Sequence, residues 1–275
     1  MSGLTVEVED FCAPVGARCE IRTRRGDRQP AEVIGFHGRA AVLMPLSDGL
    51  GISRGDSVSC ISTSMTVPVG EHMLGRVINA CGEPIDGKGP LLCQIRRDVH
   101  AERLGALART RIDRPLATGV RCIDALMTVG AGQRMGIFSG PGVGKSVMLG
   151  MIARFTAADV AVIALVGERG REVREFIERD LGEEGLRRSV VIVSTSDEPA
   201  PLRVQAGFMA ATVAEYFRDR GSDVLLLMDS VTRIAMAQRQ IGLAMGEPPA
   251  AKGYTPSVFA LLPRLIERCG RNASG

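Results

Sequence analysis

The chain has 275 residues, of which 45% are hydrophobic and 24% are charged, a composition typical of a folded globular protein of one or two domains. Its 34 Lys and Arg residues against 31 Asp and Glu residues leave a net charge of +3, too small to indicate a nucleic-acid or acidic-membrane partner. Apolar runs such as 160–166 fall far short of the roughly 20 residues that cross a bilayer, and residues 1–10 lack a basic, apolar signal pattern. We therefore expect a cytoplasmic protein.

The cysteines and histidines indicate no metal site. The seven cysteines are odd in number and widely scattered, without a Cys-x-x-Cys pair, which is typical of reduced thiols in a reducing compartment. His37, His72 and His100 stand alone, and none lies at metal-ligand spacing from another His or a Cys. We therefore predict no zinc in this chain.

Residues 1–66 are predicted to form a small N-terminal β-barrel domain. Residues 4–9 alternate apolar and polar side chains, and three more short apolar segments follow between turn-rich stretches. The three segments are 31–36, 41–46 and 57–61. Some barrels stack single-stranded nucleic acid on aromatic rings, but Phe11 and Phe36 are the only aromatic residues here. We therefore expect a structural or assembly role for this domain.

Residues 67–275 are predicted to form an α/β domain with a parallel sheet. Residues 66–116 form a Gly/Pro-rich connector, and beyond it four short apolar segments alternate with stretches that can be helical. The four segments are Arg134–Phe138, Val160–Val166, Ser189–Val193 and Val224–Met228. Strand–helix alternation of this kind predicts a sheet covered by helices on both faces. An apolar stripe at helical spacing, from Leu202 through Ala206, Met209 and Val213 to Phe217, is predicted to face the core.

The strongest chemical signal is a glycine-rich segment, Ser139–Ser146, that follows the first apolar segment and precedes a helical run. Its glycines let backbone N–H groups converge on phosphate oxygens, its lysine can reach the β- and γ-phosphates, and its last hydroxyl can ligate Mg²⁺. Ser139 occupies the position at which the strict phosphate-binding-loop pattern has its first glycine, and a side chain as small as serine fits there. The residues predicted to hold a nucleotide are Gly140, Pro141, Gly142, Val143, Gly144, Lys145, Ser146 and Val147.

Two strand ends supply the other candidate groups. Asp229 closes the apolar segment 224–228, and a carboxylate there can hold Mg²⁺ together with Ser146. Glu168 and Arg169 follow the segment 160–166, where the carboxylate could orient an attacking water and the guanidinium could stabilise charge. The catalytic candidates are thus Lys145, Glu168, Arg169 and Asp229.

Each of these interpretations has a structural alternative. Asp229 could cap a helix, and the segment 167–172 could be a solvated, salt-bridged helix start. Arg233 could reach phosphate or pair with a nearby carboxylate, and the segment 246–249 could be a plain turn or a subunit contact.

Together, several motifs resemble the export ATPases of flagellar and type III secretion systems. The motifs are Gly75–Ala80, Thr118–Arg121, Gly144–Ser146, Gly167–Glu172, Ala214–Asp219, Leu226–Ser230 and Gly246–Pro249. That family is similar to the catalytic subunit of rotary ATP synthases, with an N-terminal β-barrel, a RecA-like P-loop core, a C-terminal helical domain and a ring with ATP between neighbours. The resemblance implies that Lys145 and Ser146 bind phosphate and Mg²⁺, that Glu168 activates water, that Arg169 contacts the γ-phosphate region and that Asp229 supports the metal.

The resemblance also implies an assembly and partners. It implies a homo-hexamer that hydrolyses ATP at the cytoplasmic face of the secretion apparatus, releasing export chaperones and unfolding substrate proteins. Its other partners would be stalk and stator proteins of the apparatus, with peripheral membrane association only and no nucleic acid.

In such proteins the chain continues past the position of Arg268, with further core strands, an adenine wall, an arginine that reaches into the neighbour's site and the helical domain. This sequence ends at Gly275, so we expect the C-terminal part of the core and the helical domain to be absent, which leaves turnover uncertain. The alternatives are the catalytic subunit of a rotary ATP synthase and a non-catalytic nucleotide-binding assembly module. A third possibility is an RNA-dependent helicase of similar core, which should have stacking aromatic residues in the barrel, and this barrel is poor in them.

Overall fold

The chain begins with a five-stranded antiparallel sheet in the computed structural model, which describes residues 4–101, 105–140 and 142–271. Its strands are β1 (Val6–Glu9), β2 (Arg18–Arg22), β3 (Arg28–His37), β4 (Ala40–Pro45) and β5 (Ser57–Ser62). They pair in the order β1-β4-β3-β2-β5 around a small core that includes Ile21, Val33 and Leu43. Four of the strands lie where apolar segments predict them, and β2 was missed although Cys19 and Ile21 alternate with charged residues there.

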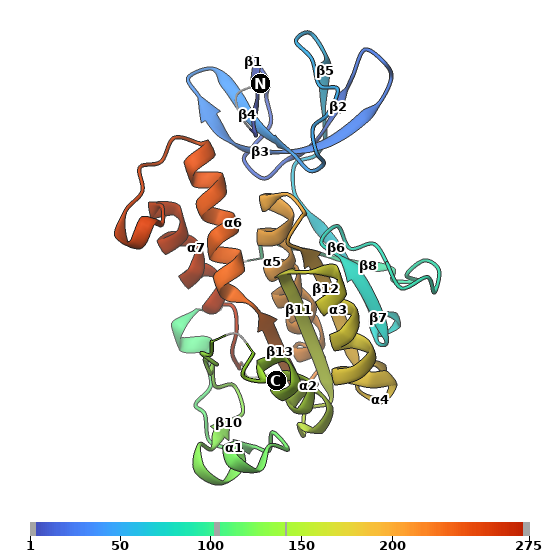
Figure 1. Ribbon diagram of the computed structural model, residues 1–275, viewed down its shortest axis with the longest axis vertical. Helices are drawn as coiled ribbons and strands as arrows, with labels where there is room; N and C mark the ends of the chain where they lie inside the picture. Colours follow the sequence, from blue (N-terminus) through green and yellow to red (C-terminus); the bar gives the residue numbers. More distant parts are fainter. Residues whose placement is uncertain (1–3, 102–104, 141, 272–275) are drawn as a thin grey trace.

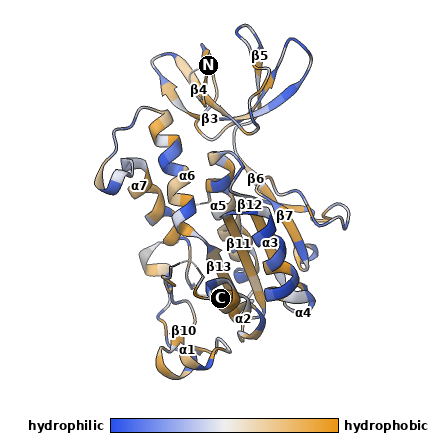
Figure 2. Ribbon diagram, in the orientation of Figure 1, coloured by the Kyte–Doolittle hydropathy of each residue, from blue (hydrophilic) through white to orange (hydrophobic). Residues whose placement is uncertain are grey.

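The second sheet is parallel and forms the centre of the body below the N-terminal sheet (Figure 1). Its strands are β7 (Arg76–Asn79), β11 (Val160–Glu168), β12 (Ser189–Thr195) and β13 (Val224–Asp229), in the order β13-β11-β12-β7. The three later strands confirm three of the four predicted segments. Figure 2 shows these central strands in apolar colours, whereas α3 and the outer loops of the first sheet carry hydrophilic stretches.

Helices cover both faces of this sheet, as the alternation predicts. Along β11, Val160, Val162 and Ala164 pack in one core with α5 (Ala200–Arg218), whereas Ala161 and Ile163 pack in a second core with α2 (Lys145–Phe155). The predicted stripe from Leu202 to Phe217 is buried, which confirms that it is a core face. Because successive side chains of a strand point to opposite faces, this apolar run fills both cores at once.

The remaining elements surround these layers. They are β6 (Thr66–Val69), β8 (Ile95–Asp98), β9 (Pro115–Leu116), β10 (Val129–Gly130), α1 (Arg121–Leu126), α3 (Gly170–Glu175), α4 (Gly182–Arg187), α6 (Val231–Ala244) and α7 (Pro256–Ile266), with a π-helical turn at Phe176–Leu181 and 3₁₀ turns at Glu71–Met73, Ala106–Ala108 and Ala251–Gly253. Among the residues described, no helix is both long and apolar enough to span a membrane.

The prediction that residues 66–116 are only a connector is wrong. Strand β7 within it joins the parallel sheet beside β12, and β6 pairs with β8. Arg76 anchors this edge, because its Nε and Nη2 atoms donate to the Asp86 carboxylate at 2.7 and 2.9 Å. That contact holds the pKa of Asp86 well below its usual range. A strand of four residues between glycine-rich turns gives too short a pattern to be distinguished from a loop.

The predicted strand at Arg134–Phe138 is also wrong. The structure has no regular secondary structure there, and the Phe138 side chain is 97% exposed. Arg134 instead donates to the Ile266 carbonyl and the Glu267 carboxylate at 3.1 and 2.8 Å, which ties the segment to the end of α7. Within the described residues, the edge of β13 that faces away from β11 pairs with no strand. An apolar run becomes a strand only where a partner takes its backbone hydrogen bonds, and the part of the chain that the structure describes supplies none to this segment.

The contacts between the N-terminal sheet and the α/β body include an apolar cluster and a polar contact. Met44 of β4 packs with Ala200 of α5 and Ala237 of α6. Beside them, the Arg18 guanidinium donates to the side-chain carbonyl of Gln205, whose amide in turn donates to the Ala80 carbonyl. These contacts join the sheet to the helices that cover the parallel strands.

The two phenylalanines Phe217 and Phe138 give a matched test of this packing. Phe217→Ala removes a ring that is 3% exposed, so we expect the free energy of unfolding to fall by about 3 kcal/mol. Phe138→Ala removes an almost fully exposed ring and should change it by less than about 0.5 kcal/mol. Urea denaturation of both variants measures the difference, and equal losses would contradict the described packing.

Candidate functional site

The candidate site lies at the carboxyl edge of the parallel sheet. β11 ends at Glu168 and its neighbour β13 ends at Asp229, which is level with Leu165 in the parallel register. The helix α2 begins at Lys145, directly after the glycine-rich loop. Because carboxyl ends of adjacent parallel strands share one edge, side chains that are far apart in the sequence meet there.

The glycine-rich loop leaves open space beside its backbone. Gly142 and Gly144 have φ values of +75° and +87°, a left-handed conformation that glycine adopts without strain. A Cβ atom built on either of them, or on Gly140, would meet nothing within 4 Å. Such a loop can bring backbone N–H groups close to an anion at the start of α2. Val143 and Val147 are both exposed, and Pro141 lies outside the described residues.

An ion pair joins the loop to the sheet. The Lys145 ammonium donates to the Asp229 carboxylate, although the two residues are 84 positions apart. Asp229 is only 5% exposed, and Lys145 is the positive partner of this buried carboxylate. The alternative that Asp229 caps α6 has no support, because the residue before that helix, Ser230, has no side-chain cap and Asp229 is engaged by Lys145.

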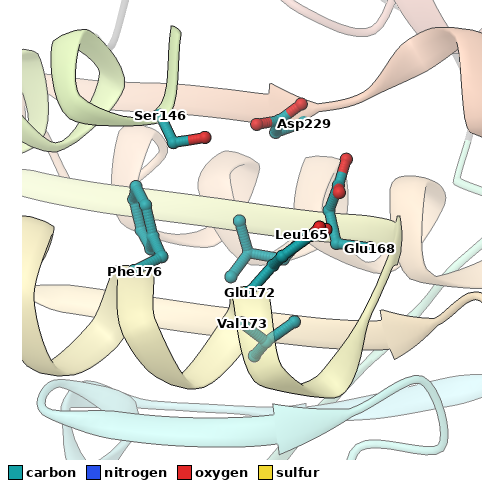
Figure 3. Close-up of a pocket in the computed structure, with 7 residues that line it drawn as sticks. All are labelled: Ser146, Leu165, Glu168, Glu172, Val173, Phe176 and Asp229. Atoms are coloured by element: carbon teal, nitrogen blue, oxygen red, sulfur yellow. The ribbon is translucent and has the colours of Figure 1, made fainter. Parts of the chain in front are cut away.

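A small pocket opens beside this ion pair. Its lining residues are Ser146, Leu165, Glu168, Glu172, Val173, Phe176 and Asp229. In Figure 3 the Ser146 hydroxyl and the Glu168 and Asp229 carboxyl groups point into the same space, above the apolar side chains of Val173 and Phe176. The structure therefore brings Lys145, Ser146, Glu168 and Asp229 together, as the strand-end argument predicts.

Glu168 lies in an environment that favours its protonated form. Partial burial raises the pKa of its carboxyl group, and a hydrogen bond with Glu172 and the charge of Asp229 raise it further, against the charges of Lys145 and Arg233. The same hydrogen bond lowers the pKa of Glu172. When the pair shares one proton, the proton therefore belongs to Glu168. A carboxyl group with a raised pKa is a stronger base once it is ionised.

Arg169 lies outside this pocket. Its side chain is 82% exposed and reaches Glu172 at 3.7 Å, and its backbone N–H donates to the same carboxylate at 3.4 Å. These contacts make it the N-terminal cap of α3. The alternative of a salt-bridged helix start thus describes Arg169 in this structure, whereas Glu168 one residue earlier points into the site.

Two features that the sequence left open now have positions. Arg233 lies next to the site, since a Cβ atom on Gly167 would approach its Cβ to 2.8 Å and its charge acts on Glu168. Glu247, in the segment 246–249, accepts the backbone N–H of Ser257 at 3.0 Å and so steadies the start of α7. Arg233 belongs with the candidate site, and Glu247 has a structural contact.

Sequence reasoning did not single out Glu172, Val173 and Phe176, which line the pocket from α3 and the π-helical turn that follows it. Glu172 could have been found, because a glutamate three residues after a helix cap is a known pattern. Val173 and Phe176 could not, since apolar residues on a short helix usually face a core.

Comparison with known proteins shows the family. Residues 119–275 match the nucleotide-binding domain of the ATP synthase alpha/beta family, and residues 1–61 match the β-barrel domain of the same family. The chain belongs to the ATP synthase alpha/beta family. This assignment confirms the predicted combination of an N-terminal β-barrel with a P-loop core that contains a parallel sheet. The predicted domain boundary after residue 66 stays a prediction.

Named relatives confirm the resemblance to export ATPases. The flagellum-specific ATP synthase of Bacillus subtilis is 53% identical over 99% of this chain and 63% of that relative. The type 3 secretion system ATPase of Xanthomonas euvesicatoria is 51% identical over 99% of this chain and 62% of its own length. The assembled ATPase EscN from the type III secretion system of enteropathogenic E. coli has a TM-score of 0.91 and 42% identity, over 100% of this chain and 66% of EscN. The chain thus spans less than two thirds of the length of these relatives.

A nucleotide-binding family implies a phosphate-bearing ligand with Mg²⁺, and the residues present fit both. The Ser146 hydroxyl and the Asp229 carboxylate are hard oxygen donors of the kind that Mg²⁺ prefers, and they lie in one pocket. The glycine-rich loop has room beside its backbone, and the Lys145 ammonium, directly after the loop, contacts Asp229.

The pKa relation between the two glutamates is directly testable. Glu172→Gln removes a charged carboxylate that favours the proton on Glu168, so we expect the pKa of Glu168 to fall. A ¹³C NMR titration of the glutamate side-chain carbons measures it. Glu175→Gln is the matched control, because Glu175 pairs with Arg179 on the exposed side of the helix and should leave Glu168 unchanged. An unchanged pKa in Glu172→Gln would contradict the contact.

Proposed function

We propose that this chain is the nucleotide-hydrolysing part of an export ATPase of a flagellar or type III secretion apparatus. The observation that carries the proposal is the convergence of Lys145, Ser146, Glu168 and Asp229 at one sheet edge in a chain of this family. The resemblance to flagellar and type III secretion relatives, at about half identity over almost the whole chain, favours the export systems within it.

Each side chain has a role that its surroundings support. Backbone N–H groups of the glycine-rich loop and the Lys145 ammonium would bind the phosphates of ATP, and Ser146 and Asp229 would hold Mg²⁺. Bound Mg²⁺ neutralises charge on the phosphate oxygens. Glu168 would orient a water molecule and accept its proton, a task suited to a base of raised pKa in a partly buried pocket.

Glu172, Arg169 and Arg233 would assist the residues that bind and hydrolyse the nucleotide. Glu172 would hold the Glu168 carboxyl group in place through their shared hydrogen bond. Arg233, beside Gly167, is better placed than the exposed Arg169 to contribute positive charge near the γ-phosphate. Arg169 could contact the γ-phosphate only in an assembly in which its side chain leaves Glu172.

The proposed partners follow from the relatives. EscN has been solved as an assembled ATPase and in complex with its central stalk EscO. By analogy we propose that the complete protein forms a homo-hexamer at the cytoplasmic face of the apparatus. There it would contact stalk and stator proteins, release export chaperones and unfold their substrates. Co-purification with export chaperones tests this assignment, whereas co-purification with a synthase rotor alone would instead support the rotary ATP synthase.

Lysine substitution tests the nucleotide site. Lys145→Ala removes the ammonium that binds phosphate and leaves Asp229 without its partner, so we expect nucleotide affinity to fall at least tenfold and phosphate release to stop. Binding of a fluorescent ATP analogue and release of phosphate with Mg²⁺ measure the two effects. Lys252→Ala, on an exposed turn, is the matched control and should behave as the parent chain. If Lys145→Ala released phosphate as fast as the parent chain, the proposed enzyme activity would be contradicted. If the parent chain bound ATP tightly but released no phosphate, it would instead be a non-catalytic assembly module.

Substitution of the proposed base separates binding from chemistry. In Glu168→Gln we expect ATP binding to persist while phosphate release falls by about 10² to 10⁴-fold, because the amide cannot accept the proton of water. The ionised carboxylate is the active form and is populated above its pKa. Since that pKa is raised, release should decline on acidification at a pH above that of an ordinary glutamate, and Glu172→Gln should move the decline to lower pH. A pH profile of phosphate release that these substitutions do not change would contradict the role of Glu168.

A further inference from the structure

Two cysteines face each other across neighbouring strands of the N-terminal sheet. Strands β2 and β5 are antiparallel, and Cys19 lies directly opposite Cys60 in their register. Directly opposed residues of an antiparallel pair have Cα atoms about 4.5 to 5.5 Å apart, which falls within the separation that a disulfide spans. Both residues are free thiols.

The side chains of this pair point to the same side of the sheet. Ile21 and Val58, two residues away on the same strands, are also directly opposed, and both pack in the core of the N-terminal sheet. Because side chains alternate along a strand, Cys19 and Cys60 share that inner face. Cys60 is also one of the groups that raise the pKa of the Cys19 thiol. The two side chains are thus neighbours across the strand pair.

The two thiols differ in their access to solvent. Cys19 is buried under the sheet, whereas Cys60 is exposed on β5, the last strand in the order of the sheet. Among the described residues, β5 pairs only with β2, so its outer edge is open. A small oxidant can therefore reach Cys60 first, and Cys19 is positioned to react next.

We propose that Cys19 and Cys60 form a redox-active pair that a low-molecular-weight disulfide converts into an intrachain disulfide between β2 and β5. The Cys60 thiolate attacks one sulfur of the small disulfide, whose S–S bond breaks and releases one small thiol. The Cys19 sulfur, after losing its proton, then attacks the Cys60 sulfur and releases the second small thiol. Two protein thiols and one small disulfide thus give one protein disulfide and two small thiols, and two electrons pass to the small molecule.

The order of attack follows from the environment of Cys19. Burial raises the pKa of the Cys19 thiol to about 11, and the charges of Cys60 and Glu32 also raise it. Cys19 is therefore a poor first nucleophile, and it becomes the resolving thiol once the Cys60 sulfur is held in a mixed disulfide beside it.

The bridge would act where the N-terminal sheet meets the α/β body. Arg18, next to Cys19, contacts Glu32 within the sheet and Gln205 of α5 across the junction. Strand β5 leads at Ser62 into the segment that begins β6 at Thr66. A disulfide would fix the edge strand to β2 and so tighten the end of the sheet that connects to the nucleotide-binding body.

Peptide mapping after mild oxidation tests the pair. The reduced chain is incubated with glutathione disulfide, quenched in acid, alkylated and digested, and the peptides are identified by mass spectrometry. We expect a linked pair of peptides that contain Cys19 and Cys60, with loss of two thiols. In Cys19→Ser, Cys60 should instead accumulate as a mixed disulfide with glutathione, and in Cys60→Ala no link should form.

Cys122→Ser is the matched control, because Cys122 is exposed on α1 at the opposite end of the molecule (Figure 1) and its loss should leave the link intact. Cys60→Ala changes an exposed position of an edge strand, so it keeps the test usable if the buried Cys19→Ser does not fold. A stable glutathione adduct on Cys60 in the parent chain, a link from Cys60 to another cysteine, or no reaction at either thiol would each overturn the proposal.

Discussion

The ion pair between Lys145 and Asp229 is the contact on which the site depends. A carboxylate that is 5% exposed needs a positive partner, and Lys145, at the first position of α2, supplies it. The pair joins the loop before α2 to the end of β13, and so holds the helix against the sheet edge where Glu168 also emerges. In the proposed site, a phosphate bound at the loop would lie next to an ammonium that Asp229 holds in place.

The parallel sheet makes this arrangement possible. β11 is apolar on both faces, so it must be covered by α5 on one side and by α2 on the other. Because β11 is buried along its length, its first polar residue, Glu168, lies at its carboxyl end, at the edge of the sheet. The glutamate pair follows from the same constraint, because α3 begins immediately after β11 and places Glu172 beside Glu168. Packing of the two cores thus determines where these polar groups lie.

The sequence predicts this site well where chemistry coincides with an element boundary. Glu168 and Asp229 each end an apolar run, and the parallel topology brings such ends together whatever their separation along the chain. The sequence is less informative where a side chain's position depends on tertiary contacts. The catalytic role of Arg169 stays a prediction, and in this structure its side chain lies at the start of α3 beside Glu172 and not in the pocket. Segment 134–138 is as apolar as a strand, but nothing in the described structure pairs with it. A pattern of neighbouring residues in the sequence does not show where the Arg169 side chain lies or whether segment 134–138 finds a strand to pair with.

Different interactions hold side chains close together at the sheet edge and in the N-terminal sheet. At the sheet edge, Lys145 and Asp229 are held together by an ion pair, and the charges of both act on Glu168. In the N-terminal sheet, Cys19 and Cys60 are held close by strand register alone, because backbone hydrogen bonds between β2 and β5 fix which residues face each other. Register also keeps such a pair together when the nucleotide site changes its ligand, since the two sites share no residue. The thiol pair and the phosphate loop thus lie at separate sites, and Arg18, which contacts Gln205 of α5, lies at the junction between them.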